Sequence, residues 1–488
     1  MAVTDAIVVG AGPNGLAAAV LLARAGLGVH LIEAADTLGG GLRTSELTLP
    51  GFLHDECSAV HPLALASPFF RAFELGRRID LVVPEVSYAH PLDGAPAALA
   101  LRSLEQTAHR LDAHRAGDGR AWQNLLGPLV ARAEGIARAT LDQLLQLPRD
   151  PAAAALFGLA TLEQGTPLRT RRLVGPAPAA LLAGVTAHIP GPQPSLMTAG
   201  GGLALAVTGH TGGWPVAVGG SASIARALAE DAVAHGVTIE TGRRVRHLDE
   251  LADADAVILD VSPEQFRDLA GGQLPLRYRR TLARYRRGVA ACKVDFALSG
   301  PVPWSDPELH RTATVHLGGT REQIARAEGE AAAGRHPEHP YVLVTQPTAY
   351  DPSRAPAGKH TLWAYTHVPN GSALDVSGRI IEQIERFAPG FREVILATSV
   401  RTGRDLAAHN LNYAGGDFMG GEVSLTQMLR RPVLSPVPWA TPLPRVFLGS
   451  ASTPPGPAVH GLGGYYAART ALSRVFGIHS LPYLGVRG

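Results

Sequence analysis

The chain has 488 residues, more than one hydrophobic core usually holds, which predicts two domains or one discontinuous pair. Hydrophobic residues make up 46% and charged residues 18%, a balance that excludes a mostly disordered chain. The 44 basic and 42 acidic side chains leave a net charge of only +2, which argues against a nucleic-acid partner.

The two cysteines, Cys57 and Cys292, lie far apart and form no CxxC pair or zinc set, so we expect neither a disulfide nor a metal site. The first residues lack a basic leader, and no apolar run is long enough to span a bilayer. We therefore expect a cytoplasmic protein without a transmembrane segment, and leave peripheral membrane contact and oligomeric state open. The sequence contains only two lysines, Lys293 and Lys359, but 42 arginines, and this preference for arginine favours a bacterial source.

The start of the chain predicts a strand, a helix and a second strand. Residues 5–10 and 28–32 are short apolar runs rich in β-branched residues, and residues 16–24 are rich in Ala and Leu. The second run ends at Glu33, followed by Ala34. An acid at this place in such a unit accepts hydrogen bonds from the ribose of an adenine nucleotide.

The turn between the first strand and the helix carries the spacing GxGxxG. Gly10 permits a tight turn, Gly12 lets the backbone approach a pyrophosphate, and Gly15 lets the helix pack closely on the strand. The helix that starts at Pro13 and Asn14 would present free N–H groups and a positive dipole end to the phosphates.

A second glycine cluster follows the acidic strand end. Residues 38–44 contain Gly40 and Gly41, with Arg43 placed to reach a phosphate. A second backbone cradle favours FAD over NAD as the bound dinucleotide. Only one complete unit of this kind is present, so a separate NAD(P)H domain is not expected.

These motifs, together with later segments, give the chain a family resemblance. It resembles the FAD-dependent oxidoreductases related to phytoene desaturase and carotene ketolase, and within them the subgroup of pyridine nucleotide-disulphide oxidoreductase domain-containing protein 2 and its bacterial relatives. The matching segments are residues 5–33, 39–44, 50–55, 209–215, 219–221, 293–298, 301–304, 363–369, 384–390, 449–456 and 459–461.

The resemblance implies an α/β protein in which a discontinuous Rossmann-like FAD-binding domain is interleaved with a substrate domain of mixed sheet plus helices, as in amine oxidases. The expected FAD-binding segments are residues 1–67, 207–281 and 433–488, and the expected substrate segments are residues 68–206 and 282–432. Within the latter, residues 125–147 and 152–162 predict Leu/Ala-rich helices, a pattern more typical of packed core than of a ligand tunnel.

The middle FAD-binding segment predicts a helix over residues 221–235, capped by Ser221 or Ser223. Strands are expected at residues 237–240, 244–248 and 256–260. The resemblance implies that Val245 meets the adenine through its backbone. Val245 as plain strand core is the alternative, and both roles are compatible.

The last segment predicts a strand at residues 445–449 and a helix at residues 463–476. A helix N-terminus can stabilise the negative charge that reduction places on the flavin pyrimidine. The wider superfamily commonly has an acid where Ser450 stands, which leaves open how this end of the cofactor is held. The expected cofactor contacts here are Gly449, Ser450, Gly461 and Gly463.

The catalytic residue is left open between two candidates. Alternation places Lys293 and Asp295 on one strand face, where Lys293 either acts near the flavin or forms a structural ion pair. His460 is either a proton shuttle to the flavin or a loop histidine bonded to backbone. His54 and His61 are expected to fix a loop more than to contact the dinucleotide.

The function implied is an FAD-dependent oxidoreductase that takes a hydride from a small-molecule apolar substrate and passes electrons to oxygen, a quinone or a carrier protein. The aromatic content of 6% favours C–C desaturation or alcohol oxidation over amine oxidation. A flavin-dependent isomerase, an amine oxidase and a catalytically silent flavin-binding regulatory protein remain as alternatives.

Overall fold

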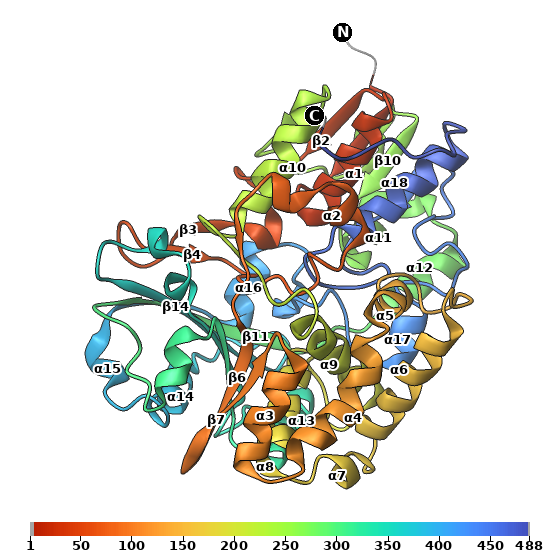
Figure 1. Cartoon of the computed structure of the whole chain (residues 1–488). Coiled ribbons are helices and arrows are strands. Elements are labelled where there is room, and N and C mark those ends of the chain that lie inside the picture. Colours follow the sequence, from red (N-terminus) through yellow and green to blue (C-terminus); the bar gives the residue numbers. More distant parts are fainter. Residues whose placement is uncertain (1–3, 487–488) are drawn as a thin grey trace.

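The computed structural model describes residues 4–486 and contains two large sheets, one fully parallel and one mixed (Figure 1). Strands of the parallel sheet come from the beginning, middle and end of the chain, and the mixed sheet is built from the segments between them. The α/β class expected from the sequence is confirmed. Within residues 4–486, no helix has both the length and the apolar composition needed to cross a membrane.

The parallel sheet lies in the upper part of Figure 1. Its strands, in spatial order, are β16 (Val446–Leu448), β10 (Ala256–Leu259), β1 (Ala6–Val9), β2 (Val29–Ile32) and β9 (Thr238–Glu240). The three central strands are apolar and almost wholly buried, as expected of parallel strands covered on both faces.

Helices cover both faces of this sheet. One face packs against α1 (Pro13–Arg24), α10 (Ala222–Ala234) and α18 (Leu462–Arg474), with α2 (Pro68–Ala72) beside them. The other face packs against α11 (Pro263–Ala270) and α12 (Leu276–Ala283). The small β3 (Thr44–Glu46) and β4 (Leu53–Asp55) pair leads from this layer to the mixed sheet.

The mixed sheet has seven strands, all antiparallel to their neighbours except the parallel pair β12–β6. In spatial order these are β15 (Ile395–Arg401), β11 (Ala290–Leu298), β14 (His360–Val368), β13 (Val342–Thr345), β12 (Thr314–Leu317), β6 (Val86–Leu92) and β7 (Ala95–Leu101). One face packs on α14 (Ser377–Glu385) and α15 (Phe391–Val394), and the other on α8 (Pro176–Thr186) and α13 (Arg321–Ala332).

A helical layer completes the lower part of the molecule (Figure 1). It consists of α3 (Leu104–His114), α4 (Asp118–Val130), α5 (Ala133–Thr140), α6 (Pro151–Gln164), α7 (Arg169–Arg172) and α9 (Leu196–Gly209). The remaining short α-helices and β-strands are α16 (Gly403–His409), α17 (Leu425–Leu429), β5 (Leu81–Val82) and β8 (Val216–Ala217).

Two expectations about this architecture are wrong. Residues 244–248 are not a strand: β9 ends at Glu240, and Val245 lies in an irregular segment, where it is buried among apolar side chains. Ser221 occupies the start of α10 without capping it, since its hydroxyl bonds Ser58 and His61 instead. The helix expected at residues 152–162 forms as α6, which contributes Ala153 and Ala160 to an apolar core cluster and leaves Leu159 and Leu162 exposed on its outer side. The predicted domain limits stay a prediction.

The helices α1 and α18 pack closely because Gly464 has no side chain. A Cβ on Gly464 would lie 1.8 Å from the carbonyl oxygen of Asn14. We predict that Gly464→Ala lowers stability by about 1–3 kcal/mol, because neither helix backbone can move without disturbing the sheet. Gly329→Ala, in a helix with no neighbouring atom within 4 Å, is the control and should raise stability by about 0.5–1 kcal/mol. Urea unfolding of the two variants measures both, and equal effects would contradict the prediction.

Candidate functional site

A cavity of about 990 Å³ runs from the carboxyl ends of the parallel strands to the inner face of the mixed sheet. The carboxyl edge of a parallel sheet is where open α/β folds bind their ligands. Predicted site residues that line it are Gly10, Gly12, Pro13, Asn14, Glu33, Ala34, Gly40, Gly41, Arg43, Val245, Ser450, Lys293 and His460. Gly15, Gly449, Gly461 and Gly463 lie behind its wall, where their missing side chains permit close packing.

The glycine turn brings bare backbone to the cavity. Gly10 has a φ of +100°, a conformation that other residues rarely adopt. A Cβ on Gly15 would lie 1.8 Å from the carbonyl oxygen of Gly10, so only glycine lets α1 start so close to β1. A Cβ on Gly40 would lie 3.1 Å from Cα of Gly12, which shows that the two predicted glycine clusters face each other across the turn.

Glu33 is held at the end of β2 by backbone. Its carboxylate accepts the N–H of Ala11 at 2.7 Å and that of Ala35 at 2.8 Å. Arg43 lies 3.7 Å from the same carboxylate and donates to the carbonyl of Thr37 at 2.9 Å. The structure therefore places Arg43 against Glu33 and Thr37 as well as on the cavity wall.

Sequence reasoning missed Asp260. This residue follows β10, and its carboxylate accepts the N–H of Gly15 at 3.1 Å beneath the glycine turn. Burial raises the pKa of Asp260 to about 7, assisted by the charge of Glu33 and opposed by the Gly15 N–H. A polar residue at the end of a buried strand was the available signal, but only the strand order places it beside β1.

On the opposite wall, Lys293 and Asp295 of β11 form a buried ion pair. Burial lowers the pKa of Lys293 in spite of the attraction of Asp295. The Lys293 ammonium also lies 5.6 Å from the centre of the Trp363 ring, and Asp295 lies 3.6 Å from His54. Lys293 is thus both paired within the fold and present on the cavity wall.

Each histidine singled out from the sequence has a ring nitrogen bonded within the protein, while Nε2 of His460 and Nδ1 of His54 have no hydrogen-bond partner among residues 4–486. Nδ1 of His460 accepts the N–H of Leu462 at 3.0 Å, and burial lowers the pKa of His460 to about 4. His61 bonds Ser221 at 3.0 Å, with a pKa lowered to about 4 by burial. His54 bonds the hydroxyl of Thr48 and lies away from the cavity lining.

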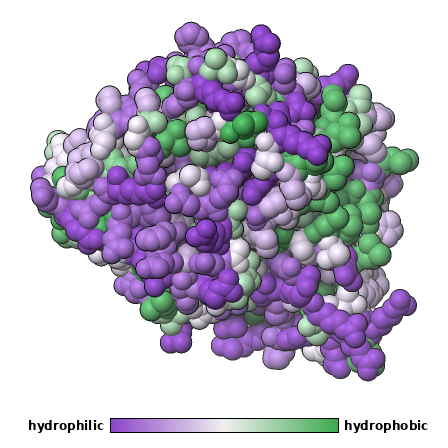
Figure 2. All heavy atoms as spheres, turned by 90° about the horizontal axis from the view of Figure 1, so that it is seen from below, coloured by the Kyte–Doolittle hydropathy of each residue, from purple (hydrophilic) through white to green (hydrophobic). Residues whose placement is uncertain are grey.

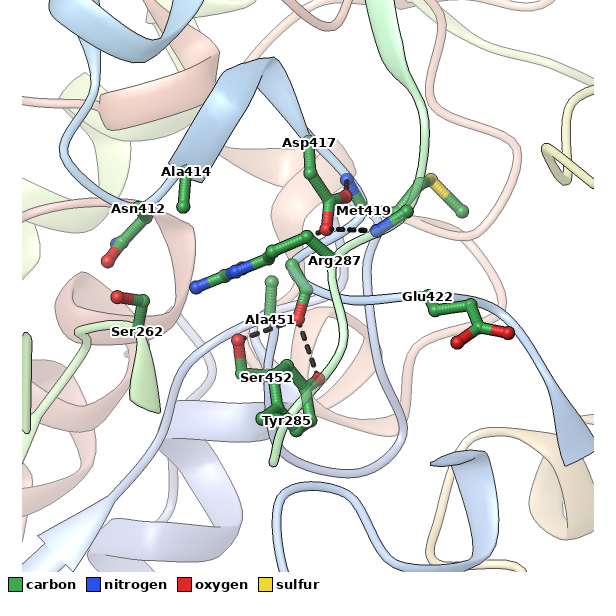
Figure 3. Close-up of polar contacts among 12 residues, drawn as sticks. Ser262, Tyr285, Arg287, Asn412, Ala414, Asp417, Met419, Glu422, Ala451 and Ser452 are labelled. Atoms are coloured by element: carbon green, nitrogen blue, oxygen red, sulfur yellow. Dashed lines mark hydrogen bonds and ion pairs between the residues drawn. The ribbon is translucent and has the colours of Figure 1, made fainter. Parts of the chain in front are cut away.

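A loop after α16 closes a further side of the cavity (Figure 3). The hydroxyls of Tyr285 and Ser452 both donate to the carbonyl of Gly420 at 2.7 Å. The carboxylate of Asp417 accepts the N–H of Met419 at 3.0 Å. Because Met419, Gly420 and Ser452 line the cavity, these bonds fix the shape of its wall.

Comparison with known proteins finds a matching family model and several relatives of this chain. Residues 8–73 match the family model described as an NAD(P)-binding Rossmann-like domain. Pyridine nucleotide-disulfide oxidoreductase domain-containing protein 2 of Rattus norvegicus is 24% identical, over 95% of this chain and 92% of its own length. Phytoene dehydrogenase of Streptomyces griseus is 27% identical, over 81% and 78%. The predicted family resemblance is confirmed.

The fold has close counterparts among solved structures. A triple mutant of putrescine oxidase, from a redesign of cofactor binding, superposes with a TM-score of 0.61 at 17% identity and covers 97% of this chain and 99% of its own. The relatives and the fold support an oxidoreductase of flavoprotein type. A bacterial source stays a prediction, because the relatives include mammalian proteins.

Asp260 predicts a pH dependence of stability. The native carboxyl has a pKa of about 7 against 3.8 in the unfolded chain, so the native state holds its proton more tightly. The resulting stabilisation is complete below about pH 4 and is lost as the pH rises through about 7. We predict that Asp260→Asn, which keeps the acceptor for Gly15, flattens this decline between pH 5 and 8 in urea unfolding. Parallel pH profiles for the two proteins would contradict the assignment.

Removing one partner of the buried Lys293–Asp295 pair should strongly lower the stability of the fold. Lys293→Met leaves the Asp295 carboxylate unpaired in the interior, and we expect a loss of about 3–5 kcal/mol in unfolding free energy. Lys359→Met removes an exposed lysine and should change stability by less than about 0.5 kcal/mol. Lys293→Met with Asp295→Leu should recover much of the loss, and a double variant no better than the single one would refute the pairing.

Proposed function

We propose that the chain is an FAD-dependent oxidoreductase that removes a hydride from an apolar organic substrate. The observation that carries this proposal is one continuous cavity that joins the glycine turn and Glu33 to Lys293 and an apolar chamber. A nucleotide-binding edge and a substrate chamber that share one space are what hydride transfer to a bound cofactor requires.

The residues present fit an adenine dinucleotide. Gly12 and Gly40 present bare backbone to the cavity, as a pyrophosphate cradle requires, and a Cβ on Gly40 would lie only 3.1 Å from Cα of Gly12. The fixed carboxylate of Glu33 suits a ribose and disfavours a 2′-phosphate. Near Glu33, Val245 would contact the adenine through its main chain, and at the other end of the cofactor Ser450 would offer its hydroxyl and backbone.

The protein's own contribution is binding, orientation and exclusion of water. FAD, when bound, supplies the hydride acceptor. Of the two catalytic candidates we favour Lys293, because its ammonium lies on the cavity wall and stays close to a carboxylate with which it can share a proton. His460 is a weaker candidate, since a pKa of about 4 keeps its imidazole neutral and its Nδ1 is already bonded.

The chamber favours an apolar substrate over a cationic amine. Its walls include Leu343, Phe418, Tyr365 and Trp363, and the Lys293 ammonium already occupies a face of the Trp363 ring. Because the Lys293 ammonium already lies over the Trp363 ring, that face is not free to bind a cationic amine. Oxidation of a C–H bond in an uncharged substrate therefore fits this chamber better than oxidation of an amine does.

The test is a reconstitution with FAD followed by a screen. The protein incubated with excess FAD and desalted should be yellow and release FAD on denaturation. Addition of apolar alcohols, ketones and polyenes should include compounds that bleach the flavin, and return of the colour in air would assign oxygen as the acceptor. Bleaching that persists in air, but is reversed by a quinone, would assign a dehydrogenase. A folded protein that takes up no FAD would end the proposal.

The ribose role of Glu33 gives a specific prediction. Glu33→Gln keeps an acceptor for one backbone N–H but loses the negative charge, so we expect FAD to bind about tenfold more weakly, as for the loss of one charged hydrogen bond. Glu46→Gln on the neighbouring exposed strand end is the control. Fluorescence titration of FAD measures both, and an unchanged Kd for Glu33→Gln would remove the ribose role.

A further inference from the structure

Several side chains on the cavity wall carry a buried polar atom that has no hydrogen-bond partner among residues 4–486. These side chains are Asn14, Thr161, Thr314, Thr345, Trp363 and His460. Most buried polar groups in folded proteins are hydrogen-bonded, so each exception calls for a cause. A ligand in the cavity is the cause to consider first where such groups gather on one wall.

Three of these side chains form a row across the mixed sheet. Thr314 of β12 lies directly opposite Thr345 of β13, and Thr345 lies directly opposite Trp363 of β14. Residues directly opposite each other share one face of a sheet, with Cβ atoms about 4.5–5.5 Å apart. We call Thr314, Thr345 and Trp363 the polar row. Their exposed fractions are only 1%, 3% and 8%.

The polar row lies within an otherwise apolar part of the wall. Leu343 and Tyr365 line the cavity from the same face, two residues away from Thr345 and Trp363 on their strands. The hydroxyls of Thr314 and Thr345 do not bond each other, although the two residues are neighbours in the ladder. The fold therefore holds two hydroxyls and one indole N–H at the cavity wall and leaves all three unpaired.

The donors and acceptors of the polar row fit an uncharged oxygen. A threonine hydroxyl both donates and accepts, whereas the indole N–H of Trp363 only donates, so a carbonyl or hydroxyl oxygen can pair with them. A charged group buried here would need a counter-ion. The lysine of this wall, Lys293, is already paired with Asp295.

The mouth of the cavity also fits an uncharged molecule. Leu144, Gly158 and Leu425 are exposed and line the cavity, so they mark an opening without charged side chains of their own. Figure 2 shows apolar residues gathered on the side of the molecule where Figure 1 places α6 and α17. An apolar molecule with one polar oxygen can pass this opening at little cost in desolvation.

We propose that the polar row binds a carbonyl or hydroxyl oxygen of an otherwise apolar substrate, through the hydroxyls of Thr314 and Thr345 and the N–H of Trp363. In the sheet, β13 and β12 are two and three strands away from β11, or about 10 and 14 Å. The oxygen would therefore anchor the substrate at a distance from Lys293 instead of being the group that reacts. This assignment of the substrate class rests on the proposed function, in which Lys293 is the favoured catalytic residue.

Ligand binding to the full chain tests the anchor without any turnover. The ligands are 4-phenyl-2-butanone and butylbenzene, which share a carbon skeleton and differ in one carbonyl oxygen. Each displaces the neutral fluorescent probe N-phenyl-1-naphthylamine, and the displacement gives its Kd. Thr314→Val with Thr345→Val should raise the Kd of the ketone at least about tenfold, as for the loss of two hydrogen bonds. The Kd of butylbenzene should change less than about twofold.

Matched variants separate the anchor from the fold. Thr361→Val removes another buried, unpaired hydroxyl of β14 that does not line the cavity, so both Kd values should stay as in the wild type. Thr314→Ser with Thr345→Ser keeps both hydroxyls and should keep the tight binding of the ketone. Because the replaced hydroxyls are unpaired, the valine variants should melt no lower than the wild type.

The other outcomes contradict the anchor. An unchanged Kd of the ketone in the valine double variant would mean that water alone satisfies the hydroxyls, and an equal rise for both ligands would mean a general change of the cavity. Wild-type protein that binds neither ligand would also overturn the proposal. Protein that shows the ketone effect but takes up no FAD would refute the proposed function alone, and FAD-loaded protein without the ketone effect would refute the anchor alone.

Discussion

The contact of α1 with its neighbours is the constraint on which the site depends. Gly15 brings the helix against the backbone of Gly10, and Gly464 brings α18 against Asn14, with no side chain between the backbones in either place. These contacts fix the beginning and the end of the chain together around β1. The cavity can therefore be lined by residues from both ends, including Gly12 and Ser450.

Electrostatics within the cavity follow from burial. Charges that remain there have partners nearby, as Glu33 has in two backbone N–H groups and Lys293 has in Asp295. Burial also shifts the buried His460 and Asp260 toward their neutral forms: it lowers the pKa of His460 to about 4 and raises the pKa of Asp260 to about 7. Such a wall fits the proposed oxidoreductase function, because a flavin itself accepts the electrons and the protein need only bind and orient the reactants.

The exposed apolar residues of α6 and α17 adjoin the cavity. The mixed sheet and the helical layer enclose the apolar chamber, and α6 and α17 extend its apolar lining to the outside. Burial of the same helices against more protein would have closed the opening.

The sequence determined the features that depend on neighbours along the chain. The strand, glycine turn and helix of residues 5–24 follow from local spacing, and the shared face of Lys293 and Asp295 follows from strand alternation. Contacts between distant segments were decided only by the tertiary structure. Asp260 meets Gly15 across 245 positions because β10 pairs with β1, and Arg43 turns to Glu33 because the second glycine cluster folds back over the first. The exposure of α6 could not be predicted from the sequence either, because an apolar helix has the same sequence pattern whether or not protein covers it.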